Sequence, residues 1–101
     1  MDLRLRVYGS GDSDLESAAQ RLGDLFGPGE PHESLYRGGD YFLRKSDNTE
    51  YILQENRELE TELAEPDHPD ARLSLYITAP GDSDELERIV RSAGFAFLRA
   101  E

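Results

Sequence analysis

Apolar and charged residues alternate along LRLRVY, residues 3–8, which is the two-residue period of a strand with one buried face. We expect Leu3, Leu5 and Val7 to form that buried face. Further along, apolar residues recur at helical spacing up to Phe26, where a Gly-Pro-Gly triplet ends the pattern. The first quarter of the chain therefore predicts a strand followed by a helix.

Between Ser34 and Asn56 the pattern is that of a meander of short strands. Tyrosines and branched apolar residues are separated by Gly-Gly and Ser-Asp-Asn turns, which is the composition that hairpins need. The predicted strands are SLYR before a turn at Gly38-Gly39, DYFLRK before a turn over 46–49, and then EYILQEN.

The C-terminal third returns to the order of a strand followed by a helix. RLSLYITA, residues 72–79, alternates apolar and polar positions, as a half-buried strand does. From Leu86 to Ala93 apolar residues recur at helical spacing, and Gly94 is a typical helix-ending residue. The run FAFLR then predicts a last strand.

The two strand-helix units align as an internal repeat over about residues 3–26 and 73–94, each with GDSD between strand and helix. Two such units with antiparallel strands between them resemble the ferredoxin-like βαββαβ plan, here with an extra central hairpin. We therefore predict an α+β fold in which one antiparallel sheet carries both helices on one face. The sheet residues expected on that face are Leu3, Leu5, Leu73, Leu75 and Ile77.

The GDSD segments could be helix caps or ligand sites. Ser13 with Glu16, and Asp84 with Glu87, have the spacing of a capping box. A calcium loop needs further alternating ligands and a glutamate near its twelfth position, which GDSDLES does not supply. The neighbouring carboxylates would also repel a phosphate group. We therefore predict two helix caps, with no metal and no cofactor.

The composition narrows the choice of partner. The 101 residues include 22 acids against 11 bases, a formal charge of −11, and no cysteine. Such a charge repels nucleic acid and anionic lipid and favours basic partners. The chain has no long apolar run and no secretory pattern at its N-terminus. We expect one cytoplasmic domain, residues 1–101, with no membrane contact.

The chain offers few residues for catalysis. His32 and His68 are its only histidines, and neither has a second histidine at metal-ligand spacing. No serine lies in a nucleophile-elbow motif. We therefore expect no enzyme activity.

Residues 55–70, ENRELETELAEPDHPD, contain seven acids and a single base, Arg57. The simplest interpretation of such a run is a solvated loop or a short amphipathic helix. The alternative is a negative docking surface, in which steering charge is combined with rigid aromatic contacts. The predicted partner-binding residues are Glu55, Glu58, Glu60, Glu62, Asp67 and Asp70, with Tyr51 and Tyr41 as aromatic anchors.

These features favour a small acidic protein-binding module. Its most concrete form is an immunity-type inhibitor of a bacterial toxin such as a nuclease, whose active site must be basic to hold nucleic acid. The alternative is a ferredoxin-like regulatory or ligand-sensing domain, which would bind a small molecule between its sheet and a second copy in a homodimer.

Overall fold

The computed structural model describes residues 3–11, 14–34, 39–45, 49–57, 63–80 and 84–100, and for positions 84 and 85 it describes the backbone alone. These residues form six strands and two helices. In chain order the elements are β1 (Leu3–Ser10), α1 (Leu15–Phe26), β2 (Glu30–Ser34), β3 (Gly39–Lys45), β4 (Glu50–Glu55), β5 (Leu73–Pro80), α2 (Asp84–Ser92) and β6 (Ala96–Ala100).

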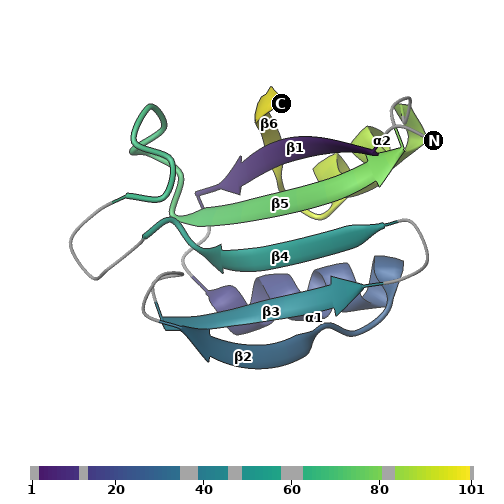
Figure 1. The fold of residues 1–101 in the computed structure, drawn as a ribbon, viewed down its shortest axis with the longest axis horizontal. Helices are drawn as coiled ribbons and strands as arrows, with labels where there is room; N and C mark the ends of the chain where they lie inside the picture. The colour runs from purple at the N-terminus through teal and green to yellow at the C-terminus, as the bar shows by residue number, and fades with distance from the viewer. Residues whose placement is uncertain are drawn as a thin grey trace.

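The six strands form one antiparallel sheet in the order β2-β3-β4-β5-β1-β6. Both helices lie behind this sheet in Figure 1, so one sheet face is covered by helices and the other carries none. The predicted α+β class is confirmed. The strand order differs from that of a simple βαββαβ plan, because β2 and β3 extend the sheet beyond β4.

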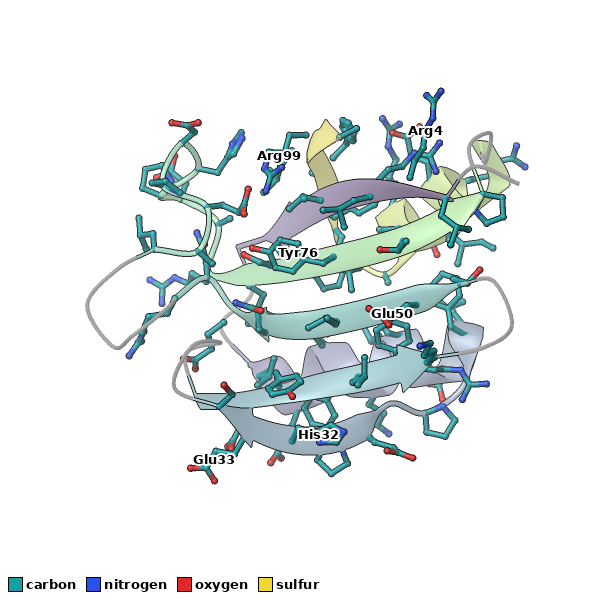
Figure 2. All side chains as sticks on the ribbon, viewed as in Figure 1. Arg4, His32, Glu33, Glu50, Tyr76 and Arg99 are labelled. Carbon is teal, nitrogen blue, oxygen red and sulfur yellow. The ribbon has the colours of Figure 1, made fainter. Side chains whose placement is uncertain are left out.

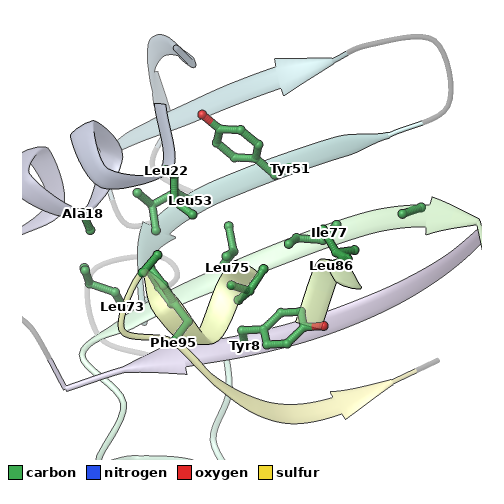
Figure 3. Packing of buried hydrophobic residues seen from close by; sticks show 13 residues of the cluster. Tyr8, Ala18, Leu22, Tyr51, Leu53, Leu73, Leu75, Ile77, Leu86 and Phe95 are labelled. Carbon is green, nitrogen blue, oxygen red and sulfur yellow. The ribbon is translucent and has the colours of Figure 1, made fainter. Parts of the chain in front are cut away.

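Buried apolar side chains from the sheet and from both helices form one core cluster (Figure 3). The predicted core residues Leu73, Leu75 and Ile77 all belong to it. Burial of apolar surface stabilises the folded chain by about 25 cal/mol per Å² and is the main stabilising contribution to the fold. The helices contribute Ala18, Leu22, Leu86 and Val90 to the same cluster, and Ala93 joins it directly after α2.

The face prediction for β1 was wrong. Residues that pair across neighbouring antiparallel strands share a sheet face, and Tyr8 pairs with the core residue Leu75, whereas Val7 pairs with Tyr76. Tyr8 therefore faces the helices, and Leu3, Leu5 and Val7 face the other side. Alternation along a strand separates two sets of residues, but it does not say which set meets the helices.

The first strand of the meander begins earlier than predicted. β2 is Glu30–Ser34, whereas the pattern placed a strand at SLYR from Ser34 onward. Residues 35–38 lie outside the described part of the chain. Ser34 pairs with Gly39, so the hairpin is centred two residues before the predicted Gly38-Gly39 turn. That shift changes every cross-strand neighbour in the hairpin.

The cap of α1 is also one residue later than predicted. Asp14 is the N-cap, and its side chain accepts a hydrogen bond from the backbone N–H of Ser17 at 3.2 Å. Ser13 lies outside the described residues, and so does the Asp84 side chain at the start of α2. In the part of the chain that the structure describes, no helix has the length and apolar character needed to cross a membrane.

Candidate functional site

The start of α1 and the β2–β3 hairpin enclose a pocket at one edge of the sheet. Because the hairpin extends beyond β4, the strand that α1 contacts, its helix-side residues face α1 across a hollow. The hollow has a volume of 610 Å³. Its described lining consists of Asp14, Leu15, Glu16, Pro31, His32, Glu33, Gly39, Asp40, Tyr41, Phe42 and Glu55.

This acidic pocket concentrates negative charge. Five of its described lining residues carry a carboxylate and none is a lysine or arginine. Two of the five, Asp14 and Glu16, belong to the first turn of α1, where carboxylates are favoured by the helix dipole and by free backbone N–H groups. The sequence that starts the helix thus also places two acids at the pocket.

The hairpin contributes two more carboxylates in an unfavourable arrangement. Glu33 of β2 pairs directly with Asp40 of β3, and both side chains are exposed. Like charges directly opposite on neighbouring strands destabilise a sheet. Figure 2 shows Glu33 at the outer end of β2, on the edge of the molecule. A cation bound beside this pair would relieve the repulsion.

The fifth carboxylate has a basic neighbour. Glu55, at the end of β4, forms an ion pair with Arg57 at 3.6 Å, and both side chains are well exposed. Exposed pairs of this kind contribute little, at most about 1 kcal/mol. Glu55 can therefore exchange Arg57 for another positive group at small cost.

The structure brings two of the eight predicted binding residues, Tyr41 and Glu55, to the acidic pocket. Tyr51 is only 3% exposed and donates a hydrogen bond to the Gly27 carbonyl oxygen at 3.2 Å, so it belongs to the core rather than to a docking surface. Asp67 and Asp70 are exposed in the segment between β4 and β5. Glu58, Glu60 and Glu62 lie outside the described residues.

One acid of the 55–70 run is part of the fold. The Glu65 side chain is 6% exposed and accepts hydrogen bonds from Arg99 Nε at 2.6 Å and from Tyr76 Oη at 2.8 Å. Figure 2 shows Tyr76 and Arg99 near each other toward one end of the sheet. Val7 pairs with both of them and is fully buried, so the Glu65 contacts help to cover the helix-free face.

The segment around Glu65 is held by a second anchor, Asn56. The Asn56 side chain accepts a hydrogen bond from the Glu65 backbone N–H at 2.7 Å. Its Nδ2 donates to the backbone oxygens of His68, at 3.0 Å, and Ala71, at 2.8 Å. Residues 63–72 are therefore ordered by specific polar contacts, and the interpretation of the whole run as solvated does not hold for this part.

The surroundings of Glu65 shift its pKa in two directions. Burial alone raises the pKa, because it disfavours the charged carboxylate. The hydrogen bonds from Arg99 and Tyr76 and the positive charges of Arg99 and His68 outweigh burial, so the pKa lies below its ordinary value. Glu65 is therefore an ionised carboxylate that already has its cation. Glu55 in the acidic pocket also has a basic neighbour, Arg57, but both of those side chains are exposed to water.

The histidines and acids do not gather into a metal centre in the described part of the chain, where no group of three or more could hold an ion. His32 stacks on Tyr41 with ring centroids 5.4 Å apart, and its Nε2 lies 3.7 Å from Glu30 Oε2. His32 therefore contacts one aromatic ring and one carboxylate, and it belongs to no metal-binding group among the described residues.

The sequence analysis did not identify Glu33 and Asp40 as site residues, because it predicted a different register for the β2–β3 hairpin. A two-residue turn at Gly38-Gly39 would place Arg37 opposite Asp40, an attractive pair, whereas the observed register places Glu33 there. The signal that could have revealed the acidic pair is the short run EPHES, which forms β2 and lies before the first strand that the pattern predicted.

Comparisons of the chain with known protein families, with curated proteins and with solved structures gave no match.

Proposed function

We propose that this protein is an acidic protein-binding module that binds a basic partner through the acidic pocket. The observation that carries this proposal is the pocket itself, with five carboxylates and no described lysine or arginine in its lining. Potentials of opposite sign accelerate the encounter of two proteins and exclude partners of like charge.

The shape of the site supports a protein partner. The pocket has acidic walls but also apolar contacts, Leu15 and Phe42, so an arginine or lysine side chain can place its charge near the acids and its stem on apolar surface. The formal charge of −11 extends the attraction beyond the pocket.

The most concrete form of the proposal is a cytoplasmic immunity-type inhibitor that masks a basic toxin or nuclease surface. A nuclease must present cationic side chains to hold nucleic acid, and an acidic protein that covers them prevents binding of the substrate. This form requires no catalytic residue and no cofactor in the inhibitor.

We also propose that the fold is an elaborated ferredoxin-like plan. The four adjacent strands β4-β5-β1-β6, with α1 after β1 and α2 after β5, support this relation, and β2 and β3 would then be the extra hairpin. In this view the addition of the hairpin creates the acidic pocket.

The experiment that tests the function is affinity capture with three forms of the protein as bait: wild type, a pocket variant with Glu33→Gln and Asp40→Asn, and a control variant with Asp67→Asn and Asp70→Asn. The two variants lose the same charge. We expect a basic protein that the wild type and the control retain and that the pocket variant loses.

Association of the purified partner should then be measured at low and at high salt. The pocket variant should associate more slowly than the control at low salt, and the difference should shrink at high salt because exposed charges are screened. Equal association of both variants would exclude the pocket as the docking site. Slower association only after replacing Glu58, Glu60 and Glu62 by Gln would place binding on the acidic run instead. Growth inhibition by the partner, reversed by coexpression, would test the toxin form.

A further inference from the structure

A second hollow continues the acidic pocket along α1. It has a volume of 690 Å³ and shares Glu16, Pro31 and Phe42 with the acidic pocket. We call the two adjoining hollows together the α1 groove. The groove runs between one face of α1 and the helix side of the β2–β3 hairpin.

The middle of the α1 groove is small and apolar. Ala19 and Gly23 lie one turn apart on α1 and leave room above the helix, and Pro28 and Phe42 line the same hollow. A Cβ added at Gly23 would lie 3.4 Å from the Pro28 Cα, an ordinary van der Waals contact, so the connection after α1 borders the hollow at this point. An apolar side chain is therefore the group that this part of the groove fits best.

An acid lies at each end of the second hollow. Glu16 and Asp24 both line this hollow and are eight positions apart on α1, which places them about 12 Å apart along the helix axis. The described lining of this hollow includes no lysine or arginine. The hollow thus has negative charge at both ends and apolar surface between them.

These dimensions match a short extended peptide. An extended chain rises about 3.3 Å per residue and directs alternate side chains to the same side. Its first and fifth side chains are therefore about 13 Å apart, and the third lies between them on the same side. Two cationic side chains at these positions can reach Glu16 and Asp24 while an apolar third side chain enters the hollow near Ala19 and Gly23.

We propose that the α1 groove binds an extended segment of the basic partner with the pattern basic-x-apolar-x-basic. The inference rests on the proposed function and makes its partner specific, because the order of charge and apolar surface along the groove selects among basic segments. Charge complementarity identifies the occupant as a basic segment rather than an acidic or neutral one.

The test uses synthetic, fluorescently labelled peptides and fluorescence anisotropy at low salt. The matching peptide contains Arg-Ser-Leu-Ser-Arg, and a rearranged peptide of the same composition contains Arg-Leu-Ser-Ser-Arg, which puts leucine on the opposite side of an extended chain. A neutral peptide has both arginines replaced by glutamine. We expect the matching peptide to bind about tenfold more tightly than the rearranged one, as expected for partial burial of a leucine side chain.

Two variants locate the site. Ala19→Gln fills the hollow without changing charge and should remove the preference for the matching peptide, whereas Leu25→Gln, at an exposed position of α1 outside the groove, should preserve it. Urea unfolding of both variants checks that they fold. The comparison of peptides on the wild type does not depend on either variant.

The outcomes separate this inference from the proposed function. Equal binding of the matching and rearranged peptides, both tighter than the neutral one, would overturn the groove pattern and leave the basic-partner proposal standing. Equal binding of all three peptides would overturn both. No measurable binding of any peptide would overturn the groove pattern. A dimer seen by sedimentation and abolished by Ala19→Gln would identify a second copy as the occupant and would also overturn it.

Discussion

Glu65 and the pair formed by Glu33 and Asp40 are carboxylates in opposite surroundings. Glu65 is buried, and a cation from a distant strand, Arg99, reaches it together with a tyrosine hydroxyl. Glu33 and Asp40 are exposed, face each other across two strands, and form no ion pair with a described base. The first carboxylate completes the fold, whereas the other two work against it.

This difference shows how charge is used in a strongly acidic protein. A buried carboxylate must be satisfied within the chain, because its desolvation would otherwise cost several kcal/mol. An exposed carboxylate keeps its water and can remain available for a partner. Repulsion that the free protein tolerates at the acidic pocket can therefore become binding free energy when a cation arrives.

The largest expected effect is on the Glu65 ion pair. Arg99→Ala leaves a buried carboxylate without its cation and should lower the free energy of unfolding by about 3 kcal/mol, the low end for a buried pair because the Arg99 side chain is 38% exposed. Urea unfolding measures it. The control is Arg91→Ala, which removes an exposed pair with Glu87 and should cost at most about 1 kcal/mol. Equal losses of stability in Arg99→Ala and Arg91→Ala would mean that the Glu65 ion pair contributes no more than an exposed pair.

The pH dependence of stability should depend on the same residue. Because the folded-state pKa of Glu65 is lowered, its contribution is complete above the ordinary glutamate value of about 4.3 and is lost as the pH falls from there through the folded pKa. The wild type should therefore lose more stability than Glu65→Gln between pH 5 and acidic pH. Urea midpoints across that range measure the difference. Parallel curves would contradict the assignment.

Asp14 connects the two regions, since it caps α1 and also lines the acidic pocket. Asp14→Ala should lower stability by about 1 kcal/mol through loss of the cap, whereas Asp14→Asn keeps a capping side chain and should cost much less. Thermal or urea unfolding distinguishes the two. If Ser13→Ala costs more than Asp14→Ala, the cap lies where the capping-box pattern predicted it.

The smallest effect should have the opposite sign. Glu33→Gln or Asp40→Asn removes a repulsive cross-strand pair and should raise the free energy of unfolding by about 0.2–1 kcal/mol. Asp67→Asn, which removes one exposed charge elsewhere, controls for the general repulsion in an acidic chain. A loss of stability in the pocket variants would show that the pair is held by a favourable interaction and would weaken the contrast with Glu65.

The local pattern of the sequence predicted most elements well. Five of the six strands and both helices lie close to where the periodicity placed them, and α1 ends at Phe26 before the Gly-Pro-Gly triplet, as predicted. These features depend on residues a few positions apart. Gly27 illustrates this: it caps α1 with a φ of 96°, a conformation that glycine adopts without strain.

The residues of the candidate site were harder to predict from the sequence than the strands and helices were. The predicted residues Tyr41 and Glu55 do line the acidic pocket, but Tyr51 is buried in the core and Asp67 and Asp70 lie in another segment. Acidic residues are so common in this chain that their positions along it carry little information. Their positions in space depend on which strands become neighbours.

The sequence by itself determined where five of the six strands and both helices form, the α+β class, and a strongly negative net charge, because periodicity and net charge are properties of the chain alone. The tertiary structure decided three further points: that Tyr8 rather than Val7 faces the helices, that Glu33 lies opposite Asp40, and that Arg99 reaches Glu65. Each of these depends on strand register or on contacts between distant segments. A shift of register exchanges faces and partners without changing the local pattern, so only the complete sheet could settle them.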